Sequence, residues 1–203
     1  MAIEFKGRVA IITGAGGGIG RATCLKLAEA GANLILVDFN DELVAQTFDL
    51  VTQVGVKAIT VHADVTQDAA VKNYVEAAVK EFGNIDGFYN NAGIEGKIGP
   101  VAELDKPDWD RVVAVNLTGV YLGMRYVLPV MIAQGFGSIV CTGSIASSLG
   151  LPQTIAYNAA KHGVAGIVRT AAAEVAKDGV RVNAVAPGMI NTRMLQDIAS
   201  HLI

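Results

Sequence analysis

A glycine-rich stretch near the start of the chain, Thr13-Gly-Ala-Gly-Gly-Gly-Ile-Gly20, constrains the fold more than any other feature. It follows a short apolar run and precedes an amphipathic segment, which is the pattern of a turn between a strand and a helix. A helix N-terminus attracts an anion such as pyrophosphate, because it has unpaired N–H groups and a positive dipole end. Glycine at Gly14, Gly18 and Gly20 removes the Cβ atoms that would keep the backbone away from that anion. A flexible loop without a ligand is the alternative reading.

Strand and helix patterns alternate along the rest of the chain. The strands are continuous apolar runs, as in a sheet that is buried on both faces, and 52% of the residues are hydrophobic. This alternation predicts an α/β fold with one doubly wound parallel sheet and right-handed crossovers. A length of 203 residues fits one domain over 1–203. The expected strands are 9–12, 33–37, 57–62, 86–89, 138–143 and 180–186, and the expected helices are 21–30, 41–54, 67–82, 107–134 and 155–177.

Charge and cysteine content exclude several classes of protein. The net charge is −3 and no basic block occurs, so we expect no nucleic-acid partner. Cys24 and Cys141 are isolated, which favours a reducing compartment over a disulfide scaffold. Neither a signal peptide nor an uninterrupted apolar run long enough to span a bilayer is found, so a soluble, cytoplasmic protein without a membrane partner is expected. The three histidines lack metal-ligand spacing with cysteines or carboxylates, and no metal site is expected.

Asp38 ends the second apolar strand, 18 residues after Gly20. This is close to the spacing of the acidic residue that binds the adenosine ribose in dinucleotide-binding proteins. A carboxylate there accepts hydrogen bonds from the ribose diol and repels a 2′-phosphate. Neither Ala15 nor Phe39 carries a positive charge that would offset the repulsion, so the sequence favours NAD over NADP. A cap for the helix that starts near Asp41 is the other reading of Asp38.

Tyr157 and Lys161 are four residues apart and therefore share one helix face. A lysine cation about 5 Å away, at an effective dielectric near 20, favours the phenolate by roughly 3 kcal/mol, or about two pKa units. This would bring a phenol with an ordinary pKa near 10 towards the range of general acid–base catalysis. Ser144 precedes this helix and could bind the same substrate oxygen. Asn116, in the middle of an expected helix, is more typical of a solvent-facing position or a modest kink.

In combination these features resemble the classical short-chain dehydrogenases/reductases over almost the whole chain. Their order and spacing agree with that family, since 28 residues separate Asn116 from Ser144, 13 separate Ser144 from Tyr157 and 4 separate Tyr157 from Lys161. The resembling motifs are Thr13-Gly-x-x-x-Gly18-x-Gly20, Asp64, Asn90-Asn91-Ala92-Gly93, Asn116, Ser144, Tyr157-x-x-x-Lys161 and Pro187-Gly188.

The resemblance implies roles for four catalytic residues. Tyr157 would protonate the oxygen in ketone reduction and accept the proton in alcohol oxidation, and Ser144 would hold that oxygen. Lys161 would bind the nicotinamide ribose and lower the tyrosine pKa. Asn116 would anchor a water that links Lys161 to solvent, so that its helix kink would be functional.

The resemblance also implies which residues hold the NAD cofactor. Asp64 and Val65 would contact adenine, Asn91 to Gly93 would line the nucleotide, and a segment after the sixth strand would follow the nicotinamide. The complete expected set is Gly14, Gly18, Ile19, Gly20, Asp38, Phe39, Asp64, Val65, Asn91, Ala92, Gly93, Tyr157, Lys161, Pro187, Gly188, Ile190 and Thr192.

The expected reaction is hydride transfer between NAD and a secondary alcohol or ketone. Leu149, Leu151 and Met189 favour an apolar or alicyclic substrate over a sugar, and two runs of the sequence look similar to family reductases of cyclic ketones. A 3-oxoacyl-carrier-protein reductase is an alternative, although those enzymes usually favour NADP, against which Asp38 argues.

The chain ends at Ile203, before the seventh strand of the family and the helix preceding it. The expected Rossmann sheet therefore has the order 3-2-1-4-5-6, with the last strand as an apolar edge. The helices around Asn116 and Tyr157 form one family interface, so a homodimer is expected in place of the common tetramer. A regulatory protein that binds NAD with little turnover is the non-enzyme alternative. The four retained catalytic residues argue against it.

Overall fold

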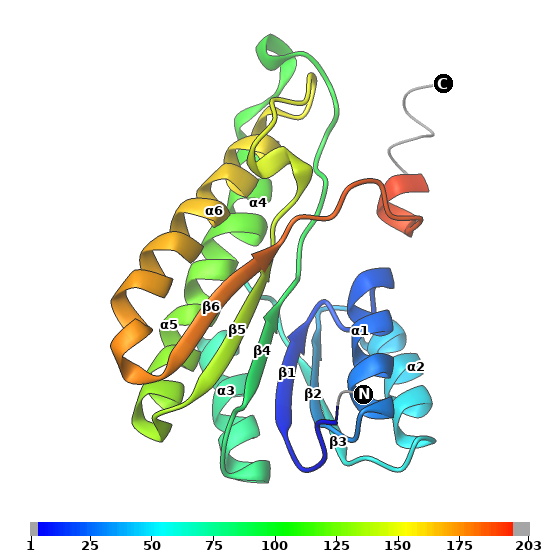
Figure 1. Ribbon diagram of the computed structural model, residues 1–203. Coiled ribbons are helices and arrows are strands. Elements are labelled where there is room, and N and C mark those ends of the chain that lie inside the picture. Colours follow the sequence, from blue (N-terminus) through cyan, green and yellow to red (C-terminus); the bar gives the residue numbers. More distant parts are fainter. Residues whose placement is uncertain (1–3, 197–203) are drawn as a thin grey trace.

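The computed structural model describes residues 4–196 and contains one six-stranded parallel sheet (Figure 1). The strand order is β3-β2-β1-β4-β5-β6, which confirms the expected doubly wound topology with β6 at the edge. Each strand lies within two residues of its expected bounds, because the continuous apolar runs mark buried parallel strands. The strands are β1 Val9–Thr13, β2 Asn33–Asp38, β3 Ala58–His62, β4 Gly87–Asn90, β5 Gly137–Thr142 and β6 Val180–Val185.

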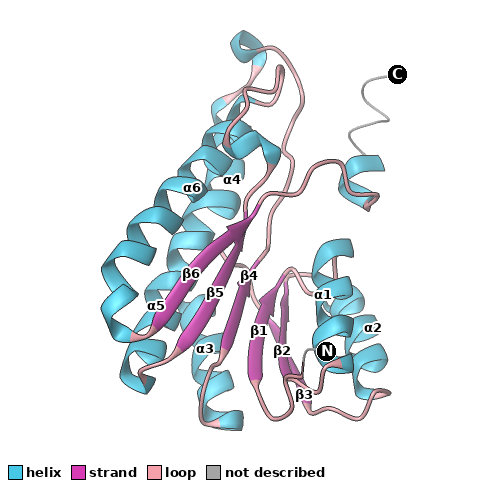
Figure 2. Cartoon of the chain, viewed as in Figure 1, coloured by secondary structure: helices cyan, strands magenta, loops and turns pink. Residues whose placement is uncertain are grey.

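Helices cover both faces of the sheet (Figure 2). Ile11 on one face of β1 belongs to a core formed with α3, α5 and α6, whereas Ile12 on the opposite face packs with α1 and α2. The main helices are α1 Gly18–Glu29, α2 Asp41–Thr52, α3 Asp68–Phe82, α4 Lys106–Val113, α5 Gly119–Gln134 and α6 Ile155–Val175, and shorter turns lie at Val101–Glu103, Ala114–Thr118, Ile145–Ser147 and Ala176–Asp178.

Local capping explains where several helices begin and end. The Asn40 side chain caps α2 by accepting a hydrogen bond from the Leu43 N–H at 2.9 Å. Asp105 caps α4 in the same way, ahead of a proline in the first turn. Gly83 and Gly135 end α3 and α5 in the left-handed conformation.

The expected single helix over 107–134 is interrupted by a π-helical turn at Ala114–Thr118, between α4 and α5. Taken as one segment, Lys106–Gln134 is long and apolar enough to cross a membrane by length and composition alone, and 44% of its most apolar window is buried. Val120, Val127 and Met131 of α5 are almost completely buried in the core shared with the sheet. This is the environment of a core helix in an α/β fold.

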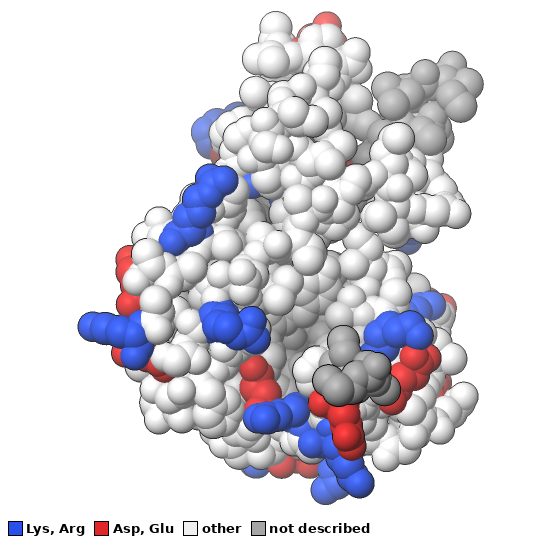
Figure 3. Space-filling view, in the orientation of Figure 1, with Lys and Arg blue, Asp and Glu red and all other residues white. Residues whose placement is uncertain are grey.

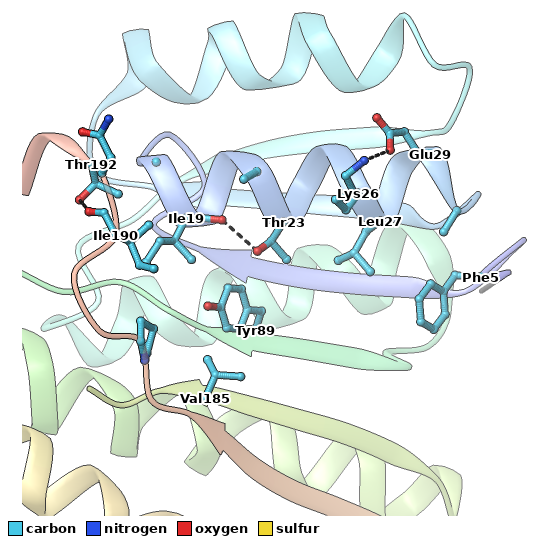
Figure 4. A pocket seen from close by; sticks show the side chains of 15 residues that line it. Phe5, Ile19, Thr23, Lys26, Leu27, Glu29, Tyr89, Val185, Ile190 and Thr192 are labelled. Atoms are coloured by element: carbon cyan, nitrogen blue, oxygen red, sulfur yellow. Dashed lines mark hydrogen bonds and ion pairs between the residues drawn. The ribbon is translucent and has the colours of Figure 1, made fainter. Parts of the chain in front are cut away.

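The face of the sheet that α1 and α2 cover is open over its other half. A cavity of about 880 Å³ lies there, between α1 and the side chains of Tyr89 and Val185 on β4 and β6 (Figure 4). Val185 is 43% exposed, although the chain pattern around it is apolar. The cavity reaches from Phe5 at the amino end of the sheet to Thr192 near the start of α1.

Candidate active site

The glycine-rich turn connects β1 to α1 and is shaped for an anion. Gly14 has φ +67°, and a Cβ on Gly20 would lie 2.0 Å from the Gly14 carbonyl oxygen, so larger residues do not fit. The N-cap of α1 is Gly17, which has no side chain, and the first turn contains no acidic residue. The first-turn N–H groups of α1 therefore face outward without a side-chain cap, which suits a pyrophosphate.

Asp38 lies beside this turn at the carboxyl end of β2. Its carboxylate accepts hydrogen bonds from the Gly16 N–H at 2.8 Å and the Asn40 N–H at 2.9 Å. The reading of Asp38 as the cap of α2 is wrong, because Asn40 performs that function. The two backbone donors hold the carboxylate at the edge of the turn, where an adenosine ribose would be within reach.

Phe39 follows Asp38 and is 68% exposed. Its ring centroid lies 5.5 Å from that of His62, the last residue of β3, whose Nδ1 is 2.9 Å from the Asp41 carboxylate. This contact leaves one face of an aromatic ring available at the edge of the site. The His162 Nδ1 lies 3.0 Å from the Asn158 carbonyl oxygen. Over residues 4–196 no cluster of potential metal ligands is found.

Asp64 and Val65 lie after β3, at the same end of the sheet. The Asp64 carboxylate accepts hydrogen bonds from the backbone N–H and hydroxyl of Thr66, at 2.9 and 2.8 Å. Val65 is 9% exposed, and its side chain packs so closely on Gly119 that a Cβ there would be 2.9 Å away. Contact of Val65 with a ligand would thus come mainly from its backbone.

Thr13, Asn91 and Thr142 join the carboxyl ends of β1, β4 and β5. The Asn91 amide donates to the Thr13 carbonyl at 3.0 Å and accepts from the Thr142 hydroxyl at 2.9 Å. The Thr13 hydroxyl accepts from the N–H groups of Asn91 and Ala92, at 2.9 and 3.0 Å. The Asn91 side chain is thus used within the protein. Thr142 was not singled out from the sequence, because nothing local marks a strand-end threonine as a partner of Asn91.

Asn116 is 0% exposed and lies in the π-helical turn, so the solvent-facing interpretation is wrong. Its side chain accepts from the Ile94 N–H at 2.8 Å and donates to the Ile94 carbonyl at 2.6 Å. The extra residue in the π turn lets a helix side chain reach a neighbouring backbone in this way. Gly93 lies between Asn116 and Lys161: a Cβ there would be 3.1 Å from the Asn116 Oδ1 and 3.7 Å from the Lys161 Nζ.

Lys161 is almost fully buried on α6, and its Nζ donates to the Thr142 carbonyl at 2.7 Å. It also lies 5.6 Å from the centre of the Tyr157 ring. Burial lowers the pKa of Lys161 from 10.5 to about 8, because the cation is removed from water. The i, i+4 spacing thus places the cation close to the phenol, as expected.

The expected lowering of the Tyr157 pKa is wrong for this structure. Burial of the phenol raises the pKa of Tyr157 above its ordinary value of 10, a hydrogen bond with the Ser144 side chain lowers it, and the charge of Glu95 raises it. The sequence argument counted only the attraction of Lys161 and omitted the removal of the phenolate from water, which is the largest effect here. Tyr157 is therefore a neutral phenol at neutral pH in this structure.

Ser144 follows β5 and faces Tyr157. It starts the short turn Ile145–Ser147, in which its Oγ accepts from the Ala146 N–H at 3.1 Å and its N–H donates to the Ser147 hydroxyl at 3.1 Å. The first bond fixes the Ser144 hydroxyl, and the second fixes the Ser144 backbone at the start of the turn. Ser144, Tyr157 and Lys161 therefore come together from β5 and α6, as the sequence predicted.

The segment after β6 crosses from the sheet to the start of α1 (Figure 1). The Pro187 carbonyl accepts from the Ile145 N–H at 3.1 Å, and a Cβ on Gly188 would lie 4.0 Å from the Ile145 side chain. Thr192 approaches the glycine turn so closely that a Cβ on Gly18 would lie 2.8 Å from its Cγ2. Ile19, Ile190 and Thr192 line the left part of the cavity in Figure 4, but this cavity does not include Asp38, Ser144 or Tyr157.

The carboxyl end of the doubly wound sheet thus carries two features. One is a strand–glycine turn–helix unit with an uncapped N-terminus, and the other is the group formed by buried Ser144, buried Lys161 and half-buried Tyr157. The model of a family described as "short chain dehydrogenase" matches residues 8–202. The chain belongs to this family. This short-chain dehydrogenase is an oxidoreductase that acts on CH–OH groups.

Named relatives are similar to nearly the whole chain. A levodione reductase of Leifsonia aquatica is 44% identical over 201 residues, which cover 98% of this chain and 75% of the relative. A crystal structure of levodione reductase has a TM-score of 0.96 and 43% identity, over 98% of this chain and 78% of that one. A cyclohexanol dehydrogenase of Acinetobacter sp. (strain SE19) is 41% identical, over 97% of this chain and 78% of the relative. A crystal structure of NAD⁺-bound xylitol dehydrogenase has a TM-score of 0.89 and 40% identity, over 91% of this chain and 71% of that one.

Replacing Asn116 with alanine in this short-chain dehydrogenase is expected to lower the unfolding free energy by about 2 kcal/mol, because the backbone N–H and carbonyl of Ile94 lose their partners. Urea unfolding followed by circular dichroism would measure the change. Asn73→Ala is the matched control, since Asn73 is exposed on α3. Equal effects of the two substitutions would contradict a supporting role of Asn116.

Proposed function

We propose that the protein interconverts a secondary alcohol and a ketone with NAD as hydride carrier, as a cytoplasmic homodimer. The observation that carries this proposal is the grouping of Ser144, Tyr157 and the buried Lys161 beside the uncapped N-terminus of α1. When bound, the nicotinamide ring of NAD supplies or accepts the hydride.

In this proposal the protein residues orient the substrate and move one proton. The Ser144 hydroxyl binds the substrate oxygen, and the Tyr157 phenol protonates it during reduction or takes its proton during oxidation. Lys161 holds the nicotinamide ribose and passes protons between Tyr157 and solvent. Asn116 keeps Gly93 and Ile94 fixed beside Lys161, and its π turn opens the helix next to this path.

The NAD site in this proposal extends from Thr192 across the glycine turn to Asp38. Glycines 14, 18 and 20 leave room for the pyrophosphate at the start of α1, and Asp38 receives the ribose diol. Phe39 and the segment at Asp64 border the adenine. Asn91 fixes the strand ends, while Ala92 and Gly93 line the middle of the nucleotide, and Pro187, Gly188, Ile190 and Thr192 follow the nicotinamide.

Discrimination against NADP is the first test of this arrangement. We expect kcat/KM to be at least about a hundredfold higher with NADH than with NADPH, because the Asp38 carboxylate repels a 2′-phosphate. Asp38→Asn should reduce that ratio about tenfold, since it removes the charge but keeps an acceptor for the Gly16 N–H. Asp49→Asn, at an exposed position of α2, is the control. A ratio unaffected by Asp38→Asn would contradict the assignment.

An alicyclic, apolar substrate fits the side chains and the relatives best. Leu149 and Met189 are 56% and 83% exposed near the site, where an apolar ring would cover them. Two similar proteins are named for levodione and cyclohexanol. NADH oxidation with cyclohexanone, a linear ketone and an acetoacetyl thioester tests the proposal. Preference for the thioester would favour an acyl-carrier reductase.

Exposed apolar side chains support the proposed homodimer, and the free cysteines support the proposed cytoplasmic location. Trp109 of α4 and Tyr121 of α5 are 37% and 49% exposed, which supplies apolar surface for a second copy. Cys24 and Cys141 are buried free thiols, as expected in a reducing compartment such as the cytoplasm.

A further inference from the structure

Glu95 lies in the loop after β4, between two residues whose backbones are fixed. On one side, the Asn116 side chain holds both backbone polar groups of Ile94. On the other side, Gly96 has φ +76° and lies so close to α4 that a Cβ would be 2.3 Å from the Val112 Cγ2. Further along the loop, the Gly99 N–H donates to the carbonyl of Gln153 at 2.9 Å. The position of Glu95 is therefore set by contacts with α4, the π turn and the loop before α6.

Glu95 is partly buried, and its carboxylate has no partner in the part of the chain that the structure describes. Within residues 4–196, neither a hydrogen bond nor an ion pair engages it. Its charge also acts on the reacting group, because repulsion from Glu95 contributes to the raised pKa of Tyr157.

The upper and central parts of the face in Figure 3 are largely uncharged, and the Lys, Arg, Asp and Glu side chains gather towards its lower part and left edge. Lys161 is the cation nearest to the phenol, and its Nζ is used by the Thr142 carbonyl. A ligand bound beside Tyr157 would therefore be acted on by the Lys161 cation and by the negative charge of Glu95.

We propose that Glu95 is a specificity-determining residue, which accepts a hydrogen bond from a second hydroxyl group of a neutral substrate and excludes substrates that carry a carboxylate. This rests on the alcohol–ketone reaction proposed above. The substrate class is thereby narrowed to neutral ring compounds with a second hydrogen-bond donor, such as hydroxyketones and diols. Like charges about 6 to 8 Å apart, at an effective dielectric near 20, repel enough to change kcat/KM ten- to a hundredfold.

Three ketones and three variants test this role. The ketones are cyclohexanone, 4-hydroxycyclohexanone and 4-oxocyclohexanecarboxylate, each with NADH in steady-state assays. For Glu95→Gln we expect kcat/KM to rise at least about tenfold with the carboxylate, to fall several-fold with the hydroxyketone and to stay within about twofold with cyclohexanone. Glu95→Asp keeps the charge and should still reject the carboxylate. Glu103→Gln removes a charge from an exposed position of the same loop and should leave kcat/KM unchanged with all three ketones.

The possible outcomes separate this role from the proposed reaction. Turnover of cyclohexanone by the wild type, with the same carboxylate-to-cyclohexanone ratio in Glu95→Gln, would overturn the role of Glu95 and leave the reaction standing. Loss of turnover of all three ketones in Glu95→Gln, with full activity in Glu95→Asp, would support a required charge in place of substrate selection and would also overturn it. No turnover of any of the three ketones by the wild type would overturn the proposed function together with this role.

Discussion

Replacing Tyr157 with phenylalanine is expected to lower kcat for ketone reduction about a thousandfold, while the Kd for NADH stays within about threefold. The substitution removes only the hydroxyl that, in the proposed reaction, gives its proton to the substrate oxygen, and positioned acid–base groups typically contribute 10²- to 10⁴-fold. The ring is kept, so packing on α6 and the contact with Lys161 should persist. Stopped-flow or steady-state NADH oxidation measures kcat, and isothermal calorimetry measures NADH binding.

Ketone reduction and alcohol oxidation should depend differently on pH, because they need different protonation states of Tyr157. Its pKa is raised by burial, so the neutral phenol needed for reduction is present at neutral pH. Alcohol oxidation needs the phenolate, and its kcat should increase as pH rises towards and beyond 10. Tyr121→Phe, at an exposed position of α5, is the matched control and should behave like the wild type. Substantial turnover in Tyr157→Phe would assign the proton transfer to another group.

Replacing Lys161 with methionine is expected to abolish most activity and yet raise the unfolding free energy at pH 7 by about 2 kcal/mol. A pKa lowered from 10.5 to about 8 means that the folded state holds the charged lysine about 3 kcal/mol less favourably than the unfolded chain. Methionine fills similar space without a charge. Loss of the bond to the Thr142 carbonyl offsets about 1 kcal/mol of the gain.

The difference in unfolding free energy between wild type and Lys161→Met should decrease as pH rises. Below pH 8 Lys161 is protonated in both the folded and unfolded states, and the full penalty is present. Between pH 8 and 10.5 the unfolded state binds more protons than the folded state, so the stability contributed at this site rises with pH. Above 10.5 the lysine is neutral in both states, and the advantage of methionine from charge should vanish.

Urea unfolding of wild type and Lys161→Met between pH 6.5 and 10.5 would measure this difference. Lys177→Met is the control, because Lys177 is exposed after α6. A Lys161→Met variant that is less stable than wild type at pH 7 would show that the buried cation is stabilised in the folded protein. Full activity of the variant would exclude Lys161 from the proposed site.

Local patterns in the sequence predicted the elements that build the site. The apolar runs indicated the strands, and the glycines indicated the turn before α1, because both are set by neighbouring residues. The four-residue spacing placed Tyr157 and Lys161 on one face of α6 for the same reason. The matching spacings around Ser144 and Asn116 indicated the family, which the match over 8–202 confirmed.

Contacts between distant parts of the chain determined which side chains of the site are buried and what they bind. Such contacts cannot be predicted from a local sequence pattern. Asn116 is held by Ile94, 22 residues away, and is buried in a π turn, where the sequence left open a solvent-facing position or a modest kink. Asn91 reaches Thr13, 78 residues away, and this bond ties the strand ends together.

The sequence by itself determined the order of the sheet, the glycine turn between β1 and α1, and the residues that we propose for the ribose position and the reacting oxygen. Only the tertiary structure decided the electrostatics around the Tyr157 hydroxyl. The Tyr157 pKa rises where the spacing predicted a fall, because distant elements bury the phenol and its lysine and bring Glu95 close enough to act on the phenol. The free energy of a charge depends on everything that displaces water around it, and that environment exists only in the folded chain.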